Sequence, residues 1–256
     1  MHHNFAVAAA CVLMRVLVMS DIHANFPALQ AVLADAQGTY DAVWCLGDVV
    51  GYGPNPNECA DTVRALPALT CLCGNHDLAA LGGSEIDDFN SYAKTAALWT
   101  SDRLSARTRE FLGGLSPRAE RAGFTLVHAS PRDEVWEYID SIDVARDNFA
   151  LFTSPYCLFG HTHRARAYVM DAAGNCIEKL PAHREALPLA GQRMLLNPGS
   201  VGQPRDRNPN AAYALLDVAM GTWEARRVAY PIADTQAQMR TAQLPAPLIE
   251  RLNTGR

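Results

Sequence analysis

Short apolar runs alternate with helical patterns through the first third of the chain. The apolar runs occupy residues 12–19, broken only by Arg15, and residues 42–46 and 69–73. Between them, apolar side chains at helical spacing predict helices over residues 27–36 and 57–66. Strands that alternate with helices in this way form a parallel sheet with helices on its faces. The alternation therefore predicts an α/β fold.

The pattern changes after the third apolar run. Residues 78–122 are expected to be helical, and residues 124–127 and 157–159 have the apolar composition of two further buried strands. Residues 130–155 between those strands are expected to be part loop and part helix.

Hairpins are expected beyond residue 163. The turn signals are Ala172-Ala173-Gly174 and Met220-Gly221. The strands expected in this part lie at residues 166–171, 175–180, 194–196, 212–218 and 223–228. A helix is predicted from Pro231 onward, followed by a polar tail.

The chain of 256 residues is long enough for one large domain with a sizeable core. The pattern assigns residues 14–230 to that core, residues 78–122 to a helical insertion, and residues 1–13 and 243–256 to the periphery. The net charge of -5 argues against a general nucleic-acid or membrane-surface binder. No apolar run is long enough to span a membrane.

The cysteines and the N-terminus bear on the cellular compartment. The seven cysteines are an odd number without the spacing of a disulfide framework. Five of them fall in apolar runs, where a free thiol packs as a small hydrophobic group: Cys11, Cys45, Cys71, Cys73 and Cys157. Residues 5–13 are apolar, but no Lys or Arg precedes them and they continue directly into a strand, which argues against a signal peptide. We therefore expect a reducing, cytoplasmic location, with Met14 as an alternative start.

Polar groups stand at the carboxyl ends of five predicted strands. In Gly160-His161-Thr162-His163 the two histidines are two residues apart, so on an extended backbone they point to the same side, roughly 6–7 Å apart. This separation suits imidazoles converging on two metal ions roughly 3.5–4 Å apart, although the motif alone also fits surface histidines on a hairpin. The whole set is Asp21, His23, Asp48, Asn75, His76, His128, His161 and His163. Because carboxyl ends of parallel strands meet at one edge of a sheet, the set predicts a site there.

The order and spacing of this set resemble the calcineurin-like metallophosphoesterase superfamily. The family pattern is Asp-x-His, Gly-Asp, Gly-Asn-His-Asp/Glu, a lone His and then Gly-His-x-His, and every part occurs here between about residues 15 and 206. Three loops resemble the small bacterial single-domain phosphodiesterase branch: Gly51-Tyr52-Gly53-Pro54, His128-Ala129-Ser130-Pro131-Arg132-Asp133 and Asn197-Pro198-Gly199-Ser200. The resemblance implies a four-layer α/β–β/α sandwich with two facing sheets, helices outside, and a dinuclear metal site at the carboxyl edge of the strands.

The resemblance also implies a role for each residue of the set. Asp48 would bridge two metal ions, and His76 would contact the phosphate and the leaving-group oxygen, so these two are the expected catalytic residues. One ion would be bound by Asp21, His23, Asp48 and His163, and the other by Asp48, Asn75, His128 and His161. Carboxylate, imidazole and amide ligands suit Mn, Fe, Zn, Co or Ni better than Mg or Ca, and manganese is typical of the family.

Two positions depart from the protein-phosphatase branch of the family. That branch has an Asp three residues after the Gly-Asp carboxylate and then an Arg, whereas this chain has Gly51 and Tyr52. The missing Asp usually orients the histidine that corresponds to His76, and Asp77 is its nearest substitute in sequence. A protein-phosphatase function is therefore not expected.

The missing Arg usually grips the phosphate, so the grip must come from elsewhere. Arg205 and Asn55 are the candidates, with Asn75 and His76 as further substrate contacts. The alternative for Arg205 is a solvated surface arginine.

The expected function is hydrolysis of a phosphate ester, with a diester preferred and a metal-bridging hydroxide as nucleophile. The expected substrate is a small phosphate ester or nucleotide. One alternative is a phosphomonoesterase or nucleotide phosphatase. Another is a non-catalytic interaction protein, because the superfamily includes a scaffold subunit of membrane-trafficking coats. A nuclease would need a basic groove with interleaved aromatic residues, which the sequence does not show. Core packing is the expected role of Trp136 and Tyr138, with stacking on a base as the alternative.

Overall fold

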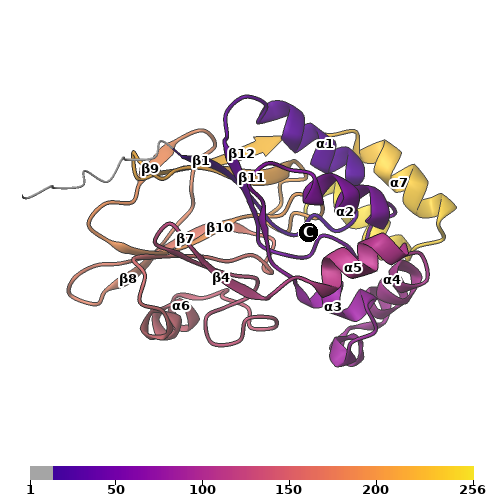
Figure 1. The fold of residues 1–256 in the computed structure, drawn as a ribbon, viewed down its shortest axis with the longest axis horizontal. Coiled ribbons are helices and arrows are strands. Elements are labelled where there is room, and N and C mark those ends of the chain that lie inside the picture. The colour runs from indigo at the N-terminus through magenta and orange to yellow at the C-terminus, as the bar shows by residue number, and fades with distance from the viewer. Residues whose placement is uncertain (1–13) are drawn as a thin grey trace, which may run out of the picture.

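Two six-stranded sheets face each other in the computed structural model, which describes residues 14–256 (Figure 1). Each sheet has a parallel half, built from strands joined by helices or long crossovers, and an antiparallel half. The predicted start of the first strand at residue 12, Cys11 and the peripheral segment 1–13 lie outside the described residues.

The first sheet has the strand order β3-β2-β1-β11-β12-β9. Its strands are β1 (Arg15–Met19), β2 (Ala42–Cys45), β3 (Thr70–Cys71), β9 (Ala186–Pro188), β11 (Ala211–Asp217) and β12 (Thr222–Val228). β1, β2 and β3 are parallel, whereas β11 joins β1 in the antiparallel sense. The parallel strands are connected by α1 (Phe26–Asp35) and α2 (Pro56–Arg64), each with a proline in its first turn.

The second sheet has the strand order β4-β5-β6-β10-β7-β8. Its strands are β4 (Arg118–Arg121), β5 (Phe124–Val127), β6 (Tyr156–Leu158), β7 (Ala165–Met170), β8 (Cys176–Lys179) and β10 (Arg193–Pro198). β5, β6 and β10 are parallel, and β6 is preceded by α6 (Ile142–Asn148) and a 3₁₀ turn (Phe149–Leu151). The two expected hairpins are present as β7–β8 and β11–β12.

Alternating side chains along the strands produce the four layers. Val16 and Val18 of β1 point between the sheets, whereas Leu17 packs with α1 and α2. In the second sheet Leu158 belongs to the central apolar layer, and Cys157 packs outward with α6. Figure 1 shows α1 above the first sheet and α6 below the second. The α/β–β/α sandwich is therefore confirmed.

The segment expected to be helical over residues 78–122 is helical only in part. It contains the second half of α3 (Asn75–Ala80), a 3₁₀ turn (Ser84–Asp88), α4 (Ser91–Ser101) and α5 (Ala106–Gly113), but it ends in β4. β4 pairs antiparallel with β5 at the sheet edge, where its side chains are half-buried or exposed. The expectation of helix there was wrong because a polar edge strand has no apolar pattern of its own; its partner strand defines it.

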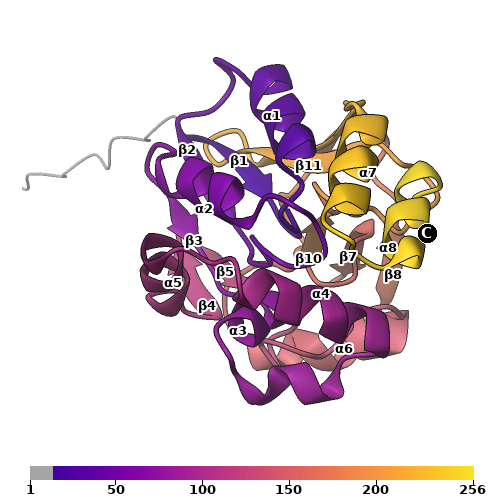
Figure 2. The ribbon, with the colours of Figure 1, turned by 90° about the vertical axis from the view of Figure 1, so that its right-hand side faces the viewer.

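The C-terminal segment also differs from the expected polar tail. After α7 (Ile232–Thr241) the chain forms α8 (Ala246–Glu250) and a 3₁₀ turn (Arg251–Asn253). Leu244, Leu248 and Leu252 recur every four residues and are buried with Tyr52 and Met239. Figure 2 shows α7 and α8 on the same face of the molecule as α4. This packing places the last turn of the chain close to the loop that contains Tyr52.

The described thiols occupy the positions expected from the apolar runs. Cys45 and Cys157 are buried in the two apolar clusters that lie outside the sheets, and Cys71 is half-buried. No helix within residues 14–256 has the length and apolar character needed to cross a membrane.

Candidate metal centre

Main-chain hydrogen bonds connect the loop that follows β1 to the loop that follows β2. The N–H of Asp21 donates to the carbonyl of Gly47 at 3.0 Å, and the N–H of His23 donates to that of Asp48 at 2.9 Å. Asp21, His23 and Asp48 all have left-handed backbone conformations, with φ of 54°, 49° and 54°. Such conformations cost about 1–3 kcal/mol each in a residue other than glycine, so they persist where the surrounding contacts enforce them. The loops hold these three side chains at the carboxyl edge of β1 and β2.

The loop after β6 has the same strained backbone. His161 and His163 have φ of 60° and 57°. The side-chain amide of Asn197 donates to the carbonyl of Gly160 at 2.8 Å and lies 3.1 Å from the hydroxyl of Thr162. The Asn197-Pro198-Gly199-Ser200 loop therefore supports the histidine loop, a positioning role that the motif alone did not reveal.

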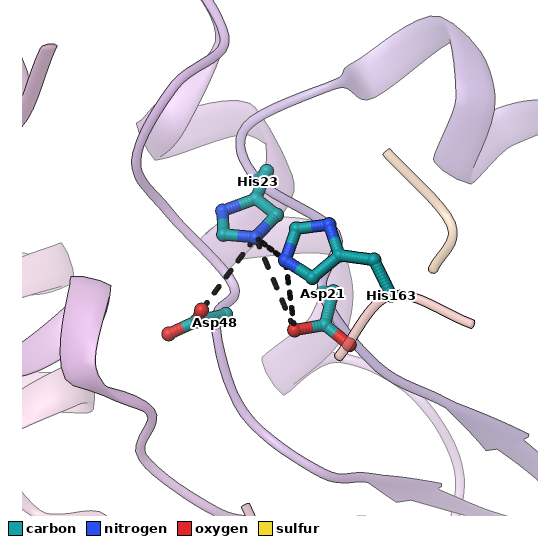
Figure 3. Close-up of side chains that lie close together, drawn as sticks. All are labelled: Asp21, His23, Asp48 and His163. Atoms are coloured by element: carbon teal, nitrogen blue, oxygen red, sulfur yellow. Dashed lines mark hydrogen bonds and ion pairs between the residues drawn. The ribbon is translucent and has the colours of Figure 1, made fainter. Parts of the chain in front are cut away.

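One group of ligand atoms forms where these loops meet (Figure 3). Asp21, His23, Asp48 and His163 each offer one atom, and all four atoms lie within 4.8 Å of one another. Nε2 of His163 is 3.5 Å from Oδ1 of Asp21, and Nε2 of His23 is 3.5 Å from Oδ2 of Asp48. The four side chains are buried. They are the four residues predicted for one metal ion.

A second group shares Asp48 with the first. Asp48, His128 and His161 also lie within the spacing of a metal site, and Oδ2 of Asp48 is 3.6 Å from Nε2 of His128. Oδ1 of Asn75, at the start of α3, lies 3.2 Å from the same nitrogen. The structure thus brings all seven predicted metal ligands to one edge of the sandwich, with the Asp48 carboxylate common to both groups.

The histidine rings are oriented for cation binding. In each ring one nitrogen faces a main-chain carbonyl and must carry the hydrogen: His23 Nδ1 to Val50, His128 Nδ1 to Leu46, His163 Nδ1 to Gln203 and His161 Nε2 to Trp136. The other nitrogen is then a lone-pair donor, as is usual for ligand histidines. Nε2 of His23 and Nε2 of His163 lie only 3.1 Å apart, an arrangement that a bound cation would stabilise.

Burial favours the neutral form of both the histidines and the carboxyl groups of the site. Burial lowers the pKa of His23, His161 and His163 well below the ordinary value, so their rings are neutral at pH 7. Burial raises the pKa of Asp48 well above its usual range and that of Asp21 to about 7. Oδ2 of each carboxylate is buried without a hydrogen-bond partner among the described residues. These residues therefore fit one or two metal ions.

His76 stands beside the ligand groups in an aromatic setting. Its main-chain N–H donates to Oδ1 of Asp48 at 2.9 Å, and its ring lies 4.2 Å from the Tyr52 ring and 4.4 Å from the Phe89 ring, centroid to centroid. Burial lowers the pKa of His76 well below its ordinary value. A Cβ atom added to Gly51 would come within 2.7 Å of Nδ1 of His76.

Asp77 does not orient His76. Its two carboxylate oxygens accept from the main-chain N–H groups of Val50 and Gly74, each at 3.0 Å. Adjacency in sequence does not bring the Asp77 carboxylate to the His76 ring, because successive residues at the start of α3 project in different directions. The Tyr52 and Phe89 rings pack against His76 instead.

The two candidates for the phosphate grip are placed differently. Arg205 is half-buried, and its Nη2 donates to Oε1 of Gln203 at 2.9 Å and lies 3.4 Å from the Tyr52 hydroxyl. The alternative of a solvated surface arginine is therefore not what the structure shows. Asn55 immediately precedes α2; its main-chain N–H donates to the carbonyl of Ala24, next to His23, and its Oδ1 is buried without a partner among the described residues.

Two aromatic residues border the second ligand group. The Tyr138 ring stacks on His161, with centroids 4.1 Å apart and planes 27° apart, yet 46% of Tyr138 is exposed. The main-chain carbonyl of Trp136 accepts from His161, and its ring packs edge-on against Phe89 at 5.6 Å. The expected core packing is therefore wrong for the exposed Tyr138, whereas Trp136 is half-buried and packs against Phe89.

Sequence reasoning missed two residues that contact the site loop. The Gln203 carbonyl accepts from Nδ1 of His163 at 2.7 Å, and its side-chain oxygen accepts from both Arg205 and Arg251. The position of Gln203 shortly after the Asn197-Pro198-Gly199-Ser200 motif is the sequence signal that could have identified it as a site residue. Arg251 has no signal in the sequence, because it lies in the C-terminal segment outside every motif.

The two facing sheets with helices outside, and a cluster of Asp and His side chains at the strand ends, define a metallophosphoesterase architecture. The calcineurin-like phosphoesterase superfamily domain matches residues 14–221, and the chain therefore belongs to this superfamily.

Relatives and solved structures agree with this assignment. An uncharacterized protein of Methanocaldococcus jannaschii is 36% identical over 253 residues, covering 94% of this chain and 98% of its own. The crystal structure of a metallophosphoesterase from Sphaerobacter thermophilus has a TM-score of 0.86 and 43% identity, covering 95% of this chain and 100% of its own. A symmetrical bis(5'-nucleosyl)-tetraphosphatase of Glaesserella parasuis is 30% identical over 139 residues, which cover 52% of this chain and 51% of that protein.

Proposed function

We propose that this protein is a dinuclear metal-dependent phosphohydrolase that prefers phosphodiesters. The observation that carries the proposal is the position of Asp48, whose Oδ2 lies 3.5 Å from Nε2 of His23 and 3.6 Å from Nε2 of His128. One ion would be held by Asp21, His23, Asp48 and His163, and the other by Asp48, Asn75, His128 and His161. The donor set suits Mn, Fe, Zn, Co or Ni, and we propose manganese. When bound, two such ions would polarise the phosphoryl oxygens and lower the pKa of a bridging water.

His76 would act on the phosphate and the leaving group. Because burial lowers its pKa, the ring is neutral at pH 7 and offers an N–H hydrogen bond to oxygen rather than a cationic charge. The Tyr52 and Phe89 rings restrict its orientation, so little freedom is lost when it engages the developing negative charge. Asn75 and His76 would contact the substrate from α3, with Arg205 as the phosphate grip and Asn55 as a further contact.

Diesters are preferred in this proposal because the site has less fixed positive charge than a protein phosphatase. Gly51 and Tyr52 occupy the positions of the orienting Asp and the gripping Arg in that branch. A diester carries one negative charge, whereas a monoester carries up to two. The single negative charge of a diester is therefore better matched to the one arginine, Arg205, that would grip the reacting phosphate.

A nucleotide phosphatase is the second candidate function. The similarity to the symmetrical bis(5'-nucleosyl)-tetraphosphatase favours it. The exposed Tyr138 ring supplies an aromatic surface beside the site on which a base would stack. The complete ligand set argues against a non-catalytic interaction protein. We propose a small nucleotide or phosphate ester as the partner, without a membrane or nucleic-acid partner, and a cytoplasmic location consistent with the buried thiols.

The proposal is tested by metal analysis and a substrate screen. The purified protein should contain up to two equivalents of a transition metal, and Mn²⁺ should support turnover of bis(p-nitrophenyl) phosphate. A panel of nucleotide and cyclic-nucleotide esters then identifies the substrate class. Absence of turnover on every ester, with metal fully bound, would exclude the hydrolase.

A further inference from the structure

Two arginines converge on a single neutral oxygen beside the metal centre. Oε1 of Gln203 accepts from Nη2 of Arg205 at 2.9 Å and from Nη1 of Arg251 at 3.1 Å. Other arginines of the chain pair with carboxylates, as Arg132 does with Glu137 and Arg227 with Asp206. Within residues 14–256, by contrast, no Asp or Glu side chain forms an ion pair with Arg205 or Arg251.

We infer that Arg205, Arg251 and Gln203 form a second anion subsite, which binds a further phosphate group of a substrate whose reacting phosphate lies at the metal centre. The inference rests on the proposed phosphohydrolase function and narrows its substrate class to compounds with two or more linked phosphates, such as nucleoside polyphosphates.

Arg205, the first arginine of the proposed subsite, lies close to the metal-ligand groups. The main-chain N–H of Arg205 donates to the carbonyl of His163 at 3.1 Å. The Arg205 guanidinium lies 5.7 Å from the centre of the Tyr52 ring, and that ring is 4.7 Å from the His23 ring. A chain of linked phosphates therefore has only a short distance to cover between the metal centre and the pair.

Arg251 is fixed in place by the packing of α8. Leu248 and Leu252, on either side of it in sequence, are buried in the same apolar cluster as Tyr52. Its Nε donates to the main-chain oxygen of Arg256 at 2.6 Å, and its Nη1 remains directed at Gln203. An arginine held in this way loses little conformational freedom on binding an anion, unlike one on an open surface.

The electrostatics of the pair favour an anion. Burial, and then the charge of Arg205, lower the pKa of Arg251 from its ordinary value. Two guanidinium groups side by side repel each other, and a phosphate between them would neutralise both and accept several N–H hydrogen bonds. In this arrangement Arg205 would contact both the reacting phosphate and the further phosphate, and Arg251 would contact only the further phosphate.

The test compares binding of two probes that differ by one phosphorus group. Isothermal titration would measure orthophosphate and methylenediphosphonate, a pyrophosphate analogue that is not hydrolysed, against the Mn²⁺-loaded protein and its Arg251→Gln variant. We expect the variant to lose about tenfold or more in affinity for methylenediphosphonate, and less than about threefold for orthophosphate, as expected for lost charge-assisted hydrogen bonds. Arg240→Gln, an exposed arginine in α7, is the matched control and should change neither affinity.

A second variant neutralises the two arginines while leaving both side chains in place. Gln203→Glu places a carboxylate between the two guanidinium groups and should abolish the preference for the diphosphonate even if Arg251→Gln is poorly folded. Equal affinities of wild type, Arg251→Gln and Gln203→Glu for methylenediphosphonate would overturn the inference and leave Arg251 a structural residue. Failure of the proposed hydrolase function would appear separately, as absence of turnover with the binding difference intact.

Discussion

The main-chain N–H of His76 donates a 2.9 Å hydrogen bond to Oδ1 of Asp48. One carboxylate oxygen of Asp48 is thereby fixed to the start of α3, while the other faces His23 and His128. The residue that would bridge two metal ions and the residue that would act on the leaving group are thus joined through the backbone. The effects of replacing Asp48 and His76 can therefore be compared by measuring metal content and turnover in both variants.

Replacing Asp48 should remove metal as well as activity. Both ligand groups include Asp48, so each is incomplete in Asp48→Ala. We expect turnover at background and a metal content of one ion or none, measured by elemental analysis of the purified protein. Asp143→Ala, an exposed carboxylate on α6, should retain both properties. Two tightly bound ions and normal turnover in Asp48→Ala would refute the site assignment.

Replacing His76 should affect rate but not metal. The His76 ring lies beside the ligand groups, so His76→Gln is expected to keep its metal content and lose at least ~10²-fold in kcat. The loss should shrink for esters with good leaving groups, which need little protonation or hydrogen bonding. His183→Gln, an exposed histidine, serves as control. Loss of metal from His76→Gln would instead identify His76 as a ligand.

Gly51 offers a test of how His76 is held. In Gly51→Ala the new Cβ would lie 2.7 Å from Nδ1 of His76, so the ring must shift and kcat should fall while metal is retained. Gly82→Ala is a matched control: its φ of +94° resembles the +91° of Gly51, but its Cβ would contact nothing within 4 Å. Both variants should lose about 1–2 kcal/mol of stability from the left-handed backbone. A similar kcat in the two variants would show that the Gly51 contact does not position His76.

The ester preference follows from the charge of the site. With Gly51 and Tyr52 in place of the carboxylate and arginine of protein phosphatases, kcat/KM should be higher for bis(p-nitrophenyl) phosphate than for p-nitrophenyl phosphate. The two substrates share a leaving group, so the comparison does not depend on how well that group departs. A clear preference for the monoester would reverse the assignment in favour of a phosphatase.

Removing the metal should lower thermal stability. The buried Oδ2 atoms of Asp21 and Asp48 lack hydrogen-bond partners among the described residues, and a bound cation compensates them. A ligand at a hundredfold excess over its Kd stabilises by about 2.7 kcal/mol, which is roughly 5–10 °C in Tm for a chain of this size. Scanning calorimetry before and after treatment with EDTA measures the difference. The shift should be much smaller in Asp48→Ala, and an equal shift in both proteins would place the stabilising ion elsewhere.

The sequence by itself determined the α/β class and the residues that come together at the strand ends. Apolar runs and helical spacing are local patterns, so β1, β2, β5 and β6 could be predicted within a few residues. Asp21, Asp48 and His163 could be identified because each lies in the loop that follows a strand, and parallel strands bring their carboxyl ends to one edge.

Tertiary structure alone decided the features that depend on contacts between distant segments. β4 is a strand only because β5 offers its edge, and the His76 ring is flanked by Tyr52 and Phe89 rather than by its sequence neighbour Asp77. Arg251 reaches Gln203, 48 residues away in sequence, because Leu248 and Leu252 are buried in the same apolar cluster as Tyr52. Such contacts are set by how elements pack, and packing depends on the combined shape of many side chains, which no local pattern in the sequence encodes.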